Sequence, residues 1–163
     1  MKRLLLFGFI ALLPGTAGTL PRLSFSELLD ASSTVIHGRV VRHWSAWDAN
    51  HEVIWTHYEV RPSEVLRGRR AASYTVSEPG GVVGEIGLNV SGSVPLIDGE
   101  EVVLFLRHMP NGLFRVTGGP QGKMQVTNTV AGKAVTAAPH VLRPIDMEHL
   151  KSAIRSGAVK EAR

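Results

Sequence analysis

The sequence contains no cysteine among its 163 residues. This absence excludes a disulfide framework, a thiol nucleophile and a thiolate metal site. It also excludes a bacterial lipoprotein, because such a protein needs a cysteine at its cleavage site. Aromatic side chains are scarce, at 6%, and after residue 13 no apolar run is longer than the five residues 102–106. We therefore expect no membrane-spanning segment in that part of the chain.

The first 18 residues have the layout of a secretory signal peptide. A basic start at 1–3 is followed by the apolar run 4–13 and by small residues through Gly18. The apolar run is far shorter than the roughly 20 residues that a membrane anchor needs. We therefore expect cleavage after Ala17 or Gly18 and export to the periplasm or the extracellular space, with no membrane anchor.

The charge balance argues against nucleic acid as a partner. Removal of the signal peptide takes away Lys2 and Arg3 and leaves 16 basic against 14 acidic side chains, a formal charge of +2. So small a charge gives no strong field for nucleic acid or anionic lipid. The local basic cluster at 67–70 favours a solvated turn at a strand end, because a phosphate footprint needs more contacts than three arginines supply.

Alternating polarity is the main structural pattern of the mature chain. Over 53–66 it predicts a strand with one wet face, which lies at a sheet edge or bends at Pro62. The apolar set is Ile54, Tyr58, Val60 and Leu66, and the other set is Trp55, His57, Glu59 and Arg61. The stretch 34–44 predicts another strand, with Ile36, Val40 and Trp44 on its apolar side and a bulge or bend at Gly38.

The remaining patterns predict more strands and two short helices. The apolar run within 101–107 is bounded by turns and therefore predicts a central strand buried on both faces. The other expected elements are helices at 24–31 and 146–156, strands at 73–77, 113–117 and 123–127, a hairpin turn at 109–112, and a strand or loose extension at 130–137. We expect one mainly β domain over residues 22–157 and a frayed tail over 158–163.

Histidine is the commonest metal ligand, and the chain has seven of them. Strand parity places His37, His57 and Glu59 on the wetter face, which is a chemically reasonable ligand set. The sequence has neither a His-Glu-x-x-His nor a His-x-His spacing, so the pattern favours surface histidines on a half-exposed sheet. We expect no metal and no cofactor, and a histidine-metal hydrolase is the weakest of our hypotheses.

The segment 79–92 is rich in glycine, with Gly81, Gly84 and Gly87 at regular spacing. A phosphate cradle must open a helix, but the residues that follow favour a strand and a turn, so this is a β loop rather than a nucleotide site. Such a loop can still bind a ligand. No Gly-x-Ser-x-Gly elbow is present, and we predict no catalytic residue. The candidate binding surface is His57, Glu59, Arg61, Gly80, Gly81, Gly84 and Gly87.

Several motifs resemble those of a family of small exported bacterial proteins without an assigned activity. The motifs are Leu28 to Val41, Ser63-Glu64-Val65-Leu66-Arg67-Gly68, Gly80-Gly81, Gly99 to Leu106 and Gln121-Gly122-Lys123. The resemblance covers about residues 25–127 and implies an exported protein.

The opening of the first strand and the Arg67-Gly68 strand end are more distantly similar to the netrin-like barrel of tissue inhibitors of metalloproteinases. This resemblance implies a mainly β fold, a small barrel of the oligonucleotide/oligosaccharide-binding type with short N- and C-terminal helices. Those inhibitors insert an N-terminal cysteine into the protease zinc site, so their mechanism does not carry over to a chain without cysteine.

These observations favour an exported, non-enzymatic binding or accessory module for an unknown protein or small-molecule ligand. Small barrels of this type bind ligands across a strand face and its loops. The alternative is a protease-associated inhibitor or chaperone-like module that acts with an exported metalloprotease.

The signal-peptide prediction can be tested by the mass of the exported protein. Because the apolar run is short and is followed by small residues, we expect a new N-terminus near Thr19. Intact-mass analysis of the exported fraction measures this directly. Recovery of the chain with Met1 in the membrane fraction would contradict the prediction.

Overall fold

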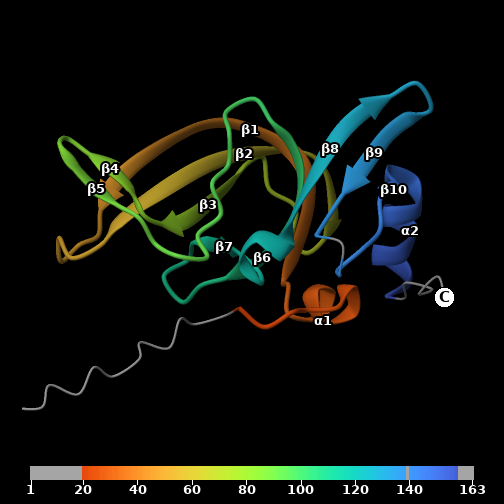
Figure 1. Ribbon diagram of the computed structural model, residues 1–163, viewed down its shortest axis with the longest axis horizontal. Coiled ribbons are helices and arrows are strands. Elements are labelled where there is room, and N and C mark those ends of the chain that lie inside the picture. The colour runs from red at the N-terminus through yellow and green to blue at the C-terminus, as the bar shows by residue number, and fades with distance from the viewer. Residues whose placement is uncertain (1–19, 139, 158–163) are drawn as a thin grey trace, which may run out of the picture.

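The computed structural model describes residues 20–138 and 140–157, so the expected signal peptide and the tail 158–163 lie outside the described residues. Strands dominate, and two short α-helices accompany them (Figure 1). The helices are α1 (Phe25–Asp30), α2 (Met147–Ser156) and a 3-10 turn, η1 (Gly119–Gly122). The strands are β1 (Thr34–Trp47), β2 (Ile54–Arg67), β3 (Tyr74–Pro79), β4 (Gly81–Val83), β5 (Ile86–Leu88), β6 (Glu101–His108), β7 (Phe114–Val116), β8 (Lys123–Thr129), β9 (Gly132–Thr136) and β10 (Ile145–Asp146). Among the described helices, none is long and apolar enough to cross a membrane.

Five strands close into a barrel. β1 pairs antiparallel with β2 on one side and with β6 on the other. β2 is antiparallel to β3, β3 is parallel to β7 through Val76 and Phe114, and β7 is antiparallel to β6. A closed five-stranded barrel flanked by short helices is the oligonucleotide/oligosaccharide-binding-type architecture. The expected fold class is therefore confirmed.

The C-terminal elements extend the sheet beyond the barrel. β6 also pairs with β8, and β8 is followed in the sheet by β9 and β10, which leads into α2. The segment predicted as a strand or loose extension at 130–137 thus contains a strand, β9. Both predicted helices are present and begin at capping side chains: Ser24 and Glu27 form a capping box at α1, and Asp146 caps α2.

Two hydrophobic clusters meet at β6. The barrel cluster is Ile36, Val40, Tyr58, Val60, Tyr74, Val76, Val94, Leu96, Val102, Leu104, Leu106 and Val116. The outer cluster is Phe25, Leu28, Leu29, Val35, Val103, Phe105, Met124, Val126, Val135, Val141, Leu142, Met147, Leu150 and Ile154. Alternate residues of β6 enter the two clusters, and the five residues 102–106 are all completely buried. The prediction of a central strand buried on both faces is confirmed.

A bulge in β1 decides which side chains face outward. Val40 pairs with Val60 and Arg42 with Glu59, so Val41 has no partner in β2. One extra residue reverses the side to which the following side chains point. Trp44 was expected on the buried side, and that prediction was wrong, because the bulge turns its indole outward and leaves it 39% exposed.

Two further bulges in β2 bend the strand after Pro62. Ser63 and Leu66 have no partner in β1. Leu66 therefore packs against the outer cluster, although the sequence pattern placed it on the same apolar side as Val60, which lies in the barrel cluster. The irregular pairing next to Gly38 and Pro62 confirms the predicted bend at this point of both strands.

The double burial of β6 can be tested by truncation. Phe105→Ala or Leu104→Ala removes a completely buried side chain and should cost about 2–5 kcal/mol of unfolding free energy through lost transfer energy and a cavity. Val130→Ala is the matched control, because Val130 is fully exposed. Thermal and urea unfolding measure the differences. Small and equal effects of all three substitutions would show that β6 is not central to the core.

Candidate binding site

The predicted wet face of β2 is the outer surface of the barrel. Trp55, His57, Glu59 and Arg61 alternate with buried side chains of the same strand, as expected. Glu59 accepts an ion-paired hydrogen bond of 2.7 Å from Arg42 Nε on β1. His57 Nδ1 lies 2.8 Å from Ser77 Oγ on β3. Side chains of β1 and β2 therefore pair on this surface, and the completely buried Ser77 of β3 supports His57 from below.

The bulge at Val41 adds an aromatic platform to this surface. Trp44 lies directly across the ladder from His57, and the centroids of their rings are 5.4 Å apart with an angle of 32° between the planes. The guanidinium carbon of Arg42 is 5.2 Å from the centroid of the Trp44 ring, within cation–π range. Burial lowers the pKa of His57, so its imidazole is mainly neutral at neutral pH and contacts Trp44 as an uncharged ring.

Trp55 lies two residues before His57 on the same face. The guanidinium carbon of Arg115 on β7 is 5.7 Å from the centroid of its ring. Arg115 also contacts Glu78, whose side chain is 2% exposed and accepts a 2.9 Å hydrogen bond from the backbone N–H of Val116. Burial raises the pKa of Glu78. We refer to Arg42, Trp44, Trp55, His57 and Glu59 as the outer patch.

The glycines of the candidate surface lie elsewhere. The glycine-rich segment forms a hairpin, β4–β5, that extends from one end of the barrel (Figure 1). Thr56 Oγ1 donates a 2.7 Å hydrogen bond to Gly80 O, and a Cβ on Gly81 would lie 2.3 Å from the same hydroxyl oxygen. The hairpin is thus packed against the side of β2 that carries Thr56, and consecutive residues of a strand face opposite sides. Gly80 and Gly81 are therefore not next to His57 on one surface.

The turn of this hairpin carries the other two predicted glycines. Gly84 has a φ of 61° at the turn, and Gly87 pairs with Val82. Val82 and Ile86 beside them are exposed. The structure therefore divides the candidate surface into two parts, the outer patch with Arg61 nearby and the hairpin with its glycines. Binding at either part stays a prediction.

The three possible metal ligands do not converge. The strand register places His37 opposite Glu64 and His57 opposite Trp44. His37 was expected on the wetter face, and that prediction was wrong, because the C-terminal elements cover it and leave it 5% exposed. Across residues 20–138 and 140–157, no group of three or more histidine, aspartate and glutamate side chains is arranged to hold a metal ion.

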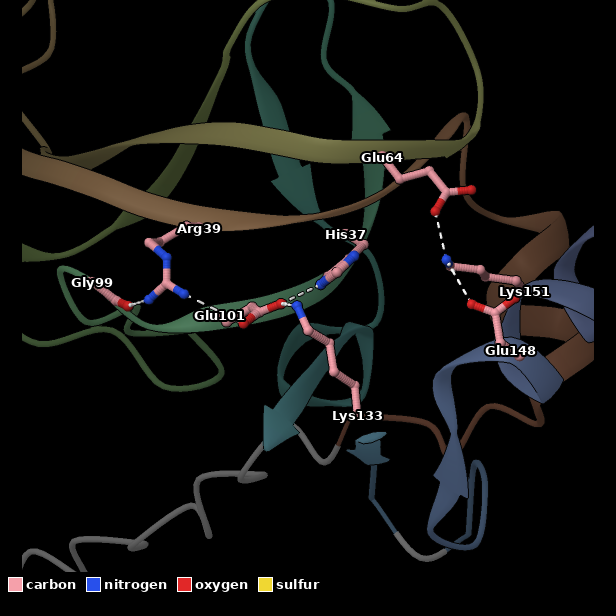
Figure 2. A network of polar contacts seen from close by, with 8 residues as sticks. All are labelled: His37, Arg39, Glu64, Gly99, Glu101, Lys133, Glu148 and Lys151. Carbon is pink, nitrogen blue, oxygen red and sulfur yellow. Dashed lines mark hydrogen bonds and ion pairs between the residues drawn. The ribbon is translucent and has the colours of Figure 1, made fainter. Parts of the chain in front are cut away.

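His37 instead belongs to a polar network between the barrel and the C-terminal elements (Figure 2). Its Nε2 lies 2.6 Å from Glu101 Oε1. Glu101 also forms ion pairs with Lys133 of β9 and with Arg39 of β1. Across a cavity of about 590 Å³, Lys151 of α2 bridges Glu64 of β2 and Glu148 of α2. Each of these carboxylates has a cationic partner. The ion pairs therefore hold the C-terminal elements against the barrel.

Sequence reasoning missed the residues that give the outer patch its character. Arg42 and Trp44 lie beyond the bulge at Val41. The sequence of a strand rich in β-branched residues does not show at which residue a bulge will form. Arg115 reaches Trp55 from β7, a strand distant in the sequence. The repeated occurrence of tryptophan at 44, 47 and 55, on both sides of one polar loop, was the available signal.

The polar network predicts a loss of stability in acid. Lys133, and to a smaller extent His37, hold the pKa of Glu101 below its ordinary range. A carboxyl group whose pKa is lower in the folded state contributes stability above its unfolded-state pKa and loses it as the pH falls. Glu101→Gln should therefore cost about 1 kcal/mol near neutral pH, and the difference from the wild type should shrink towards about pH 3.

Urea unfolding of both proteins across this pH range measures the difference. Glu85→Gln is the matched control, because Glu85 is exposed in the hairpin turn and has no ion-pair partner in the described part of the chain. A difference between wild type and Glu101→Gln that stays constant from neutral to acid pH would rule out the ionic role of Glu101.

The chain matches no protein-family model and no curated protein. Its resemblance to small exported bacterial proteins and to the netrin-like barrel therefore stays a prediction. The barrel itself does not depend on that resemblance, because the pairing of β1 with both β2 and β6 defines it.

Proposed function

We propose that this protein is an exported binding module and that the outer patch is its ligand-binding surface. The observation that carries the proposal is the position of Trp44, which lies exposed on the sheet between Arg42 and His57 instead of in the core. Barrels of this type bind ligands on the face formed by their central strands and adjoining loops. The outer patch lies on this kind of face, at the end of β1 next to the loop 48–53.

The chemistry of the outer patch favours an oligosaccharide. An exposed indole offers a flat apolar surface with little conformational entropy to lose, on which the apolar face of a sugar ring can rest. The charged pair of Arg42 and Glu59 at its edge can donate to and accept from hydroxyl groups at the same time. The carboxylate of Glu59 disfavours a phosphate backbone at this position, so nucleic acid is a poorer fit.

The proposal is one of binding and not of catalysis. The polar groups of the outer patch are already engaged, Arg42 with Glu59 in an ion pair and His57 with Ser77 in a hydrogen bond. Such pairs hold side chains in fixed positions, which favours recognition because fewer rotamers must be ordered when a ligand arrives. A glycan-binding role is consistent with export, which stays a prediction.

Titration calorimetry with cellohexaose, chitohexaose and maltohexaose tests the proposal. We expect the wild type to bind at least one of them, and Trp44→Ala to weaken that binding at least about fivefold, because the loss of a stacked ring costs on the order of 1 kcal/mol or more. Thr127→Ala is the control, because Thr127 lies on β8 away from the outer patch. Thermal unfolding checks that Trp44→Ala is folded.

Two outcomes contradict this proposal. Equal affinities of wild type and Trp44→Ala would place the sugar elsewhere on the molecule. If the wild type binds none of the three sugars, and a metalloprotease is recovered with the protein from culture supernatant, the protease-associated alternative replaces the glycan-binding one.

A further inference from the structure

A second cavity lies at the other end of β1 from the outer patch. Its volume is about 720 Å³, and its walls come from the start of β1, the loop between β2 and β3, and the turn between β6 and β7. Arg69 and Arg70 of the basic cluster line it, together with His108. The sequence pattern favoured a solvated turn for these arginines, and both are exposed in the loop that follows β2, where they also line this cavity.

The lining of this cavity, which we call the basic pocket, contains no acidic residue. Within the described part of the chain, the guanidinium groups of Arg69 and Arg70 have no hydrogen-bond or ion-pair partner. Arg42 and Arg115 differ in this respect, since Arg42 is paired with Glu59 and Arg115 with Glu78. Two unpaired guanidinium groups at one cavity give it a positive potential.

One acidic residue close to this wall, Glu64, is already paired with cations. A shallow depression that Arg70 also lines includes Glu64 among its lining residues. Glu64 is held by Lys151 at 2.7 Å and by Arg155 at 3.2 Å. Its charge is therefore compensated from α2 and does not cancel that of the basic pocket.

Aromatic rings form another part of the wall. Phe114 lies against Tyr74 with ring centroids 5.5 Å apart, and against His108 with centroids 5.1 Å apart, both edge to face. The Tyr74 hydroxyl donates a 2.6 Å hydrogen bond to Arg69 O. The loop that carries the arginines is thus fastened to the rings that line the same cavity.

The backbone conformation of Gly68 holds this loop close to β1. Its φ is +95°, and a Cβ at this position would lie 2.7 Å from Ser33 O. A side chain would therefore push the loop away from the start of β1 and move Arg69 and Arg70 with it. The conformation of Gly68 thus helps to fix the position of the two arginines.

We propose that the basic pocket binds a small anionic ligand, with an oxyanion at the arginines and a flat ring against the aromatic wall. A guanidinium group matches the planar, two-oxygen geometry of phosphate, sulfate and carboxylate. Ser73 and Thr75, which also line the pocket, add hydroxyl groups that can donate to the same oxyanion. The pocket is too small and has too few cations for a nucleic-acid strand.

NMR titration of the full mature chain with phenyl phosphate tests this proposal. We expect chemical-shift changes in the amides of 68–75 and 108–114, and weaker binding at higher salt. Phenyl sulfate and benzoate distinguish the oxyanions that are accepted. Inorganic phosphate should bind more weakly than phenyl phosphate because it lacks the ring, and the neutral analogue benzyl alcohol should leave the shifts unchanged.

The double substitution Arg69→Gln, Arg70→Gln should weaken phenyl phosphate binding at least about tenfold. Arg107→Gln, Arg143→Gln is the matched control, since it removes the same charge from two other exposed positions. Arg69→Lys, Arg70→Lys keeps the charge and should give an intermediate affinity, because an ammonium group lacks the forked geometry.

Three results would overturn the proposal. They are the absence of shift changes with the wild type at millimolar phenyl phosphate, an equal loss of affinity in the two glutamine double variants, and an equal response to benzyl alcohol. Because Arg69 and Arg70 are exposed, the variants should unfold at the wild-type temperature.

Discussion

The burial of β6 on both faces is the constraint on which the rest of the structure depends. Leu104 points into the barrel cluster and Phe105 into the outer cluster, and both are completely buried. A slip of one residue would exchange the two sets of side chains, so the register of β6 is strongly specified. Because β1, β7 and β8 all hydrogen-bond to β6, this register also positions the barrel wall and the C-terminal extension.

The outer patch depends on how β1 accommodates one extra residue. β1 is held by β6 over its first half and by β2 along its whole length. The bulge at Val41 follows directly after the last residues paired with β6, where the strand is free to change its twist. Without it, Trp44 would point into the barrel end. The bulge at Val41 thus moves the large apolar side chain of Trp44 from the buried side of the strand to the exposed side.

Sequence reasoning succeeded where burial is regular and failed where it depends on distant elements. The alternation from Ile54 to Arg61, the run 102–106 and the two short helices follow from local patterns, and the structure confirms them. The outward position of Trp44 and the burial of His37 could not be predicted in this way. The first follows from a bulge, and the second from β9 and α2, which cover β1 from about a hundred residues further along the chain.

The charged side chains of this protein serve two different physical purposes. Around Glu101 and Glu64 every carboxylate meets a cation, and these pairs join β1, β2 and β6 to β9 and α2 (Figure 2). At the basic pocket the opposite holds, because Arg69 and Arg70 are adjacent like charges with no carboxylate in the lining. Like charges held near each other oppose folding slightly, so they add nothing to the stability of the loop that carries them. The rings beneath that loop, and the hydrogen bond from Tyr74 to Arg69 O, nevertheless fix its position. The basic pocket thus has a fixed cationic wall and no carboxylate in its lining. An anionic ligand would supply the missing negative charge.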